Sequence, residues 1–270
     1  YREQMDAFEF GRSQGTSLNR EEWLRAALGV KIQFFHMGNL YYYVPARSPD
    51  STFIVGRIGR KIIVRENEPP DQEFIDTARD QWQAVDIIID PRHHSDGQKL
   101  AVECNNKVGN PVSLLDSLSH HINFSSDPPS PYRIDSNPIL DPSDFMDFVR
   151  SNKGEITSVT FELVAPNMFG IRDNIDKEMR ELKQNENVQK AKFTIENQDG
   201  LKLDTERVET TANHAAEGGG IIKAKTKKGL TFNSKKRGKK ISVPNDMTNG
   251  VDENSMWSNL IEWMFRRKGD

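Results

Sequence analysis

Apolar and polar residues alternate along several short runs of the chain, and this pattern predicts β-strands with one buried face. The first half contains four such runs, which cover residues 31–36, 40–44, 52–57 and 61–65. Gly38-Asn39 and Ile58-Gly59-Arg60 stand between them and carry turn-forming residues. We therefore expect an antiparallel meander in this part of the chain.

Apolar residues at helical spacing predict helices between and around the strand regions. Asn19 is a candidate N-cap for the first helix, and Gly29 is its expected stop. Pro111 suits the first turn of another helix, where the missing N–H of proline costs nothing. The expected helices cover residues 20–28, 71–82, 111–122, 143–149, 173–187 and 252–268.

Further strands are expected in a hairpin of residues 85–90 and 99–105, and in residues 155–164 and 191–195. Runs of strands mixed with helices predict an α+β fold with mainly antiparallel sheets and flanking helices. The pattern of apolar and polar residues changes near residues 151–154, which predicts two lobes of residues 1–152 and 153–270. The closing amphipathic helix is expected to dock on the second lobe or on a second subunit.

The composition narrows the class of protein. The chain has 270 residues, of which 35% are hydrophobic, and no run approaches the roughly 18 consecutive apolar residues of a membrane span. Cys104 is the single cysteine, so an internal disulfide is excluded. This composition is typical of a reducing compartment, and we expect a cytoplasmic protein without membrane insertion.

The charge distribution is the most informative feature of the sequence. The stretch from Gly218 to Asn245, called the basic segment below, contains nine basic residues and no acidic residue. Removing these nine from the 37 basic residues of the chain leaves 28 against 40 acidic residues, a balance of -12. The basic residues are Lys223, Lys225, Lys227, Lys228, Lys235, Lys236, Arg237, Lys239 and Lys240. Such clustering requires an exposed surface and favours a polyanionic partner.

The first three of these lysines alternate with apolar or small residues, so a strand would place them on one face at a spacing of about 6.6 Å. This arrangement predicts contacts with nucleic-acid phosphates that do not read the bases. Phe232 is the one nearby aromatic residue that could stack on a base. Two alternatives remain open: a solvated hairpin whose lysines prevent edge pairing, and a scaffold that binds acidic protein partners.

A second candidate chemistry is metal-dependent nucleic-acid cleavage. Nucleases of the restriction type hold Mg²⁺ with an Asp at the end of one strand and a Glu on the next, and a Lys two residues after the Glu supports the attacking water. Asp90 and Glu103 match the carboxylates, but Asn105 stands at the lysine position and Lys107 comes two residues later. No metal site or cofactor is expected otherwise, and the sequence favours a binding protein over an enzyme.

Residues 96–102 and 108–118, a predicted hairpin strand and helix, resemble phage exclusion proteins of the RexA family and related bacterial antiphage-defence proteins. The similarity continues through residues 156–163 and the lysine-rich strand near Lys223. The resemblance implies two lobes, a homodimer, sequence-nonspecific DNA binding and a role in aborting phage infection, with no catalytic residues to transfer. A partner protein of the same defence system is also implied. The leading hypothesis is therefore a DNA-binding defence protein, and the alternative is a divergent nuclease.

Overall fold

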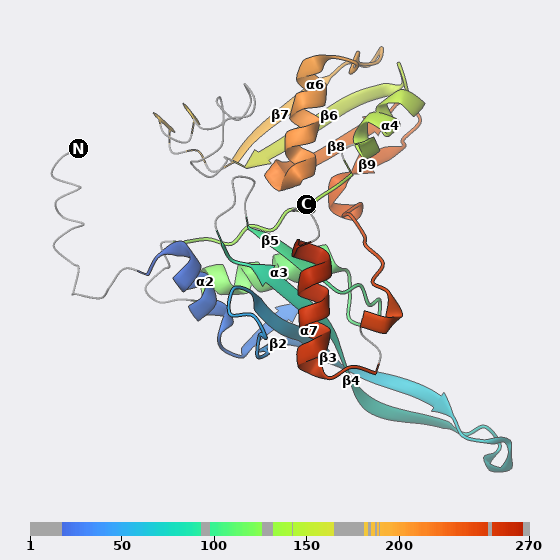
Figure 1. Cartoon of the computed structure of the whole chain (residues 1–270). Coiled ribbons are helices and arrows are strands. Elements are labelled where there is room, and N and C mark those ends of the chain that lie inside the picture. Colours follow the sequence, from blue (N-terminus) through green and yellow to red (C-terminus); the bar gives the residue numbers. More distant parts are fainter. Residues whose placement is uncertain are drawn as a thin grey trace.

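The structure, a computed structural model, describes residues 18–92, 98–125, 132–141, 143–164, 181–182, 185–186, 188, 190–247 and 250–266. These residues form a five-stranded sheet and a four-stranded sheet, both antiparallel, with helices packed on them. The α+β class expected from the sequence is confirmed. The two sheets belong to two lobes, which lie one above the other in Figure 1. No helix in the described ranges is long and apolar enough to cross a membrane.

The first sheet is the expected meander, and its strands follow one another in chain order. Helices α2 (Arg20–Leu28) and α3 (Pro111–Phe124) cover one face, and their leucines join a core with the strands. Helix α7 (Glu253–Ile261) covers the other face through Trp257, Leu260 and Ile261. The strands are β1 (Ile32–His36), β2 (Asn39–Pro45), β3 (Ile54–Asn67), β4 (Asp76–Asp90) and β5 (Lys99–Val102).

Two sequence predictions in this sheet are wrong. Residues 58–60 are not a turn but lie inside β3, because Gly59 allows the neighbouring strand to approach closely: a Cβ there would lie 2.8 Å from the carbonyl oxygen of Gln83. Residues 71–82 are not a helix, because one 3-10 turn, η1 (Pro70–Gln72), reverses the chain and the following residues pair with β3. The strands β3 and β4 therefore run on together past the rest of the sheet as a long hairpin (Figure 1).

The second sheet has the order β7 (Lys190–Glu196), β6 (Ile156–Val164), β8 (Gly220–Thr226) and β9 (Thr231–Asn233). Helices α4 (Ser143–Ser151) and α6 (Glu206–His214) contribute Phe145, Val149, Val208 and Ala212 to its core. The sequence did not predict α6. The helix expected over residues 173–187 lies largely outside the described residues.

The cores divide the chain differently from the predicted lobes of residues 1–152 and 153–270. Helix α4 packs on the second sheet although it precedes the expected boundary, and α7 packs on the first sheet although it ends the chain. The closing helix docks there because Trp257 fills the space against Phe53, Val55 and Ile88. The chain thus crosses between the lobes twice, and the backbone N–H of Lys239 on the return donates to the carbonyl oxygen of Ile139 at 2.7 Å.

Candidate nucleic-acid interface

Strand β8 presents two lysines on one face of the second sheet. Ile222, Ala224 and Thr226 point into the core, whereas Lys223 and Lys225 are exposed between them. The alternation predicted from the sequence is therefore correct for these two lysines, whose positions lie about 6.6 Å apart along a strand. The strand ends before Lys227, so Lys227 and Lys228 lie in the turn to β9 and extend the charge beyond the sheet.

The turn after β8 is held by its own hydrogen bonds. The Thr226 hydroxyl accepts from the backbone N–H of Leu230 at 3.0 Å, and the N–H of Gly229 donates to the Thr226 carbonyl at 3.0 Å. Gly229 has a φ of 80°, a conformation that glycine adopts without a steric penalty. Lys227 and Lys228 are consequently fixed in backbone position at the end of the hairpin.

Strand register places small polar side chains around the two exposed lysines. On β6, Thr160 lies opposite Lys223 and Ser158 opposite Lys225; on β9, Asn233 and Thr231 occupy the matching positions. These groups line a shallow hollow. We call this surface the lysine face, and it consists of Ser158, Thr160, Lys223, Lys225, Thr231, Asn233 and Lys236. It combines ammonium groups with uncharged hydroxyl and amide donors, which are the groups that contact phosphate oxygens in nucleic-acid complexes.

Part of the positive charge is neutralised within the protein. The Lys223 ammonium donates to Glu162 at 2.6 Å, and this hydrogen bond is the main reason why the pKa of Glu162 is lowered. Lys228 lies 3.6 Å from Glu155, and Lys227 donates to the Asp199 carbonyl oxygen at 3.0 Å. Lys225 and Lys236, in contrast, have no carboxylate partner among the described residues, so the lysine face retains net positive charge.

The remaining cations of the basic segment follow β9 on the return to the first lobe. Asn233 accepts from the backbone N–H of Lys235 at 3.0 Å and so starts a short 3-10 turn, η3 (Ser234–Lys236). The Lys235 ammonium lies 2.8 Å from Asp116 of α3 and joins the two lobes. Lys235, Lys236, Lys239 and Lys240 line a cleft between the lobes. Eight of the nine predicted cations thus form two neighbouring groups, one on the hairpin and one along this cleft, while Arg237 lies over the ring of Phe232.

Phe232, the one nearby aromatic residue that the sequence offered for stacking on a base, is buried. Its side chain is 1% exposed and packs against Phe145 and Phe148, with ring centroids 5.3 and 5.4 Å away. Residues on the inner face of β9 are covered by α4, so the ring cannot reach a ligand. Arg237 makes a cation–π contact with this ring, with its guanidinium 5.0 Å from the ring centroid.

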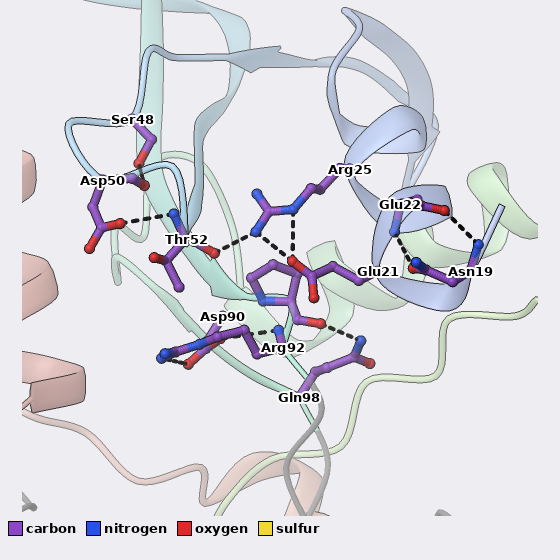
Figure 2. A network of polar contacts seen from close by, with 11 residues as sticks. Asn19, Glu21, Glu22, Arg25, Ser48, Asp50, Thr52, Asp90, Arg92 and Gln98 are labelled. Carbon is purple, nitrogen blue, oxygen red and sulfur yellow. Dashed lines mark hydrogen bonds and ion pairs between the residues drawn. The ribbon is translucent and has the colours of Figure 1, made fainter.

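The structure does not bring together the predicted nuclease carboxylates. In the β4–β5 ladder Asp90 pairs with Lys99, whereas Glu103 follows the strand and bonds to Asp86. Asp90 lies four strand positions beyond Asp86, which places their Cα atoms about 13 Å apart. Asp90 is 3% exposed, and the Arg92 guanidinium donates to both of its carboxylate oxygens at 2.9 and 2.7 Å (Figure 2).

Glu103 and Lys107 also have structural contacts. A Glu103 carboxylate oxygen accepts from the backbone N–H of Asp86 at 3.2 Å, and burial raises the pKa of Glu103. The Lys107 carbonyl accepts from Arg60 at 2.7 Å in a turn beyond the strand. Within the described ranges, no three His, Cys, Asp or Glu side chains come close enough to hold a metal ion.

Sequence reasoning missed the hydroxyl and amide members of the lysine face. Ser158 and Thr160 occupy outward positions of a strand that was predicted, although the sequence left open which of Val159 and Thr160 faces the core. Their position beside Lys223 and Lys225 depends on pairing between strands some sixty residues apart in the chain, which alternation does not reveal. Comparison with protein-family models, curated proteins and solved structures gave no match to this chain.

Proposed function

We propose that this protein binds nucleic acid, specifically the phosphate backbone of duplex DNA, through the lysine face and the adjoining cations of the basic segment. The observation that carries the proposal is the pair Lys223 and Lys225, which project among the small polar side chains of β6 and β9, where Glu162 engages only one of the two ammonium groups. Lysine ammonium groups contact phosphates as point charges, and phosphate contacts carry no sequence information, so binding through them is independent of sequence.

Duplex is favoured over single-stranded nucleic acid because the lysine face exposes no aromatic ring on which bases could stack. The one aromatic residue of the basic segment, Phe232, is buried. Binding then depends on release of counterions from phosphates. The resemblance to phage exclusion proteins supplies the proposed setting: a cytoplasmic defence protein that acts on DNA as a homodimer or with a partner of the same system.

The test is fluorescence anisotropy of a labelled duplex of arbitrary sequence, titrated with the protein across a salt series. The variant Lys223→Gln/Lys225→Gln/Lys236→Gln removes three cations of the lysine face. Its slope of log K against log salt should fall by about 0.9 for each lost phosphate contact, and its affinity at about 0.1 M salt should fall roughly eightfold per contact.

The matched control is Lys31→Gln/Lys153→Gln/Lys202→Gln, which removes the same charge from exposed lysines elsewhere. This control should bind DNA nearly as tightly as the unaltered protein. Equal losses in both triple variants would show that only net charge matters and would refute the assignment of the lysine face. Running the duplex on a denaturing gel after incubation with Mg²⁺ tests the nuclease alternative in the same samples.

A further inference from the structure

The long hairpin of the first lobe continues beyond the sheet as an uncovered two-stranded ribbon. We call residues 61–82 the arm; its strands pair from Lys61 with Trp82 to Asn67 with Asp76. The pairing of β2 with β3 stops at Arg60, and β5 pairs with β4 only from Ile87, so no third strand of the described chain flanks the arm. Six intervals of strand give it a reach of about 20 Å. Figure 1 shows it pointing away from the rest of the molecule.

The arm exposes large apolar side chains that the described chain leaves largely uncovered, although Trp82 meets the ring of Tyr42 edge-on at a centroid distance of 5.6 Å. Ile63, Trp82, Phe74 and Ile75 are 70%, 61%, 60% and 60% exposed. A two-stranded ribbon with no packed face is only marginally stable in water. Apolar side chains gathered on a projecting element are typical of an interaction surface.

The tip of the arm holds these side chains in a fixed loop. The backbone N–H of Glu68 donates to the Ile75 carbonyl at 3.0 Å, and the Asn67 amide donates to the Phe74 carbonyl at 3.0 Å. Glu73 and Phe74 both have left-handed backbone angles, with φ of 56° and 54°. Such angles cost about 1 to 3 kcal/mol each in residues other than glycine. The loop therefore displays Phe74 and Ile75 in a defined direction.

The charge of the tip decides which kind of surface it can meet. Residues 66 to 76 include five acidic side chains and no basic one: Glu66, Glu68, Asp71, Glu73 and Asp76. Like charges oppose pairing between two arms and oppose contact with phosphates. The complementary surface in this chain is the basic segment, whose hairpin turn also exposes an apolar side chain, Leu230, at 55%. The arm tip and the turn after β8 thus carry opposite charges, and each exposes apolar side chains.

We propose that the arm tip of one copy docks on the β8–β9 hairpin of a second copy, with Phe74 and Ile75 against Leu230 and the acidic residues against Lys227 and Lys228. The hairpin of the same chain belongs to the other lobe, on the far side of the molecule from the arm in Figure 1. Reciprocal docking closes a two-fold dimer. The docking requires the positive charges of these lysines, and it does not require that the protein binds DNA.

A charge-swap experiment tests this docking in solution. Variant A carries Glu66→Lys, Asp71→Lys and Glu73→Lys on the arm, and variant B carries Lys225→Glu, Lys227→Glu and Lys228→Glu on the hairpin. Each variant alone has like charges on both surfaces and should be monomeric by sedimentation velocity. Their equimolar mixture restores both contacts and should associate, whereas the unaltered protein associates with itself and dissociates as salt is raised.

A matched control with Glu206→Lys, Glu209→Lys and Glu217→Lys changes the same number of exposed acids on the second lobe and should associate like the unaltered protein. Circular dichroism of each variant checks that the fold is retained. A monomeric unaltered protein at low salt, or a mixture of A and B that fails to associate, would overturn the proposal. Variant A should bind duplex DNA at least as tightly as the unaltered protein, so failure of DNA binding and failure of docking are distinguished.

Discussion

Neutralising a carboxylate should strengthen DNA binding if the lysine face holds phosphates. Glu162 on β6 accepts a hydrogen bond from the Lys223 ammonium at 2.6 Å and competes with phosphate for that cation. The hydrogen bond from Lys223 lowers the pKa of Glu162, so the carboxylate is ionised at neutral pH and Glu162→Gln removes a full negative charge. The side chains of this pair are 46% and 30% exposed, and the pair contributes at most about 1 kcal/mol to folding.

Two effects set the size of the gain. Release of Lys223 adds up to one phosphate contact, which is worth roughly eightfold in affinity at about 0.1 M salt and raises the salt slope by about 0.9. Removal of the Glu162 charge relieves repulsion of a phosphate about 7 Å away by about 0.6 kcal/mol in water, or nearly threefold. The expected increase in affinity therefore lies between about threefold and twentyfold.

The assay is anisotropy of the labelled duplex at several salt concentrations, with thermal denaturation to confirm that Glu162→Gln folds. Glu209→Gln is the matched control, since Glu209 is exposed on α6, which covers the opposite face of the same sheet. The control should change affinity much less, because its carboxylate is separated from the lysine face by the core. An unchanged or weaker affinity for Glu162→Gln would refute the role given to Lys223.

Two further predictions concern the fold that supports both surfaces. Trp257→Ala should lower the free energy of unfolding by about 3 to 5 kcal/mol in urea titrations, because Trp257 is 0% exposed and fills the core between α7 and the first sheet, whereas Trp82→Ala, at a 61% exposed position, should cost far less. Burial raises the pKa of Tyr43 to about 12 from 10.0, so the stability due to its neutral hydroxyl is complete below pH 10 and is lost as the pH rises toward 12. The unfolding free energy should fall across this range, and Tyr43→Phe should make that fall smaller, while the part due to Tyr41, whose pKa burial also raises, should remain.

Local patterns predicted most of the secondary structure because their signals act within a few residues. Asn19 caps the first helix and Pro111 opens α3, as the sequence indicated, while the structure adds the Glu22 half of a capping box and the Asn110 cap. The arm was misread because Phe74, Ile75, Ala78 and Trp82 fit helical spacing, while pairing of β4 with β3 decides their conformation. Helix α6 escaped notice because its buried stripe consists of only Val208, Thr211 and Ala212.

In the candidate site, too, local patterns predicted some features and strand pairing decided the others. Alternation along β8 was sufficient to predict that Lys223 and Lys225 share a face. It did not reveal that Phe232 lies on the opposite face, because that depends on the register in which β9 pairs with β8. Asp90 and Glu103 were matched on sequence order alone. Their separation follows from the short β5 and its register, in which Asp90 faces Lys99 and Glu103 lies beside Asp86.

The acidic and basic side chains of the chain nearly balance in number, but the fold keeps the acidic arm tip apart from the basic hairpin. The acidic arm tip extends from the first lobe, and the basic hairpin belongs to the second, so neither reaches the other within the described chain. The hairpin lysines find only Glu162, Glu155 and a backbone carbonyl nearby, which leaves most of their field directed outward. An acidic arm from a second copy and a DNA phosphate backbone would meet that same field. We therefore expect the proposed docking to compete with DNA for the cations of the hairpin turn, Lys227 and Lys228, so that DNA should bind more tightly once the arm has been displaced from the hairpin.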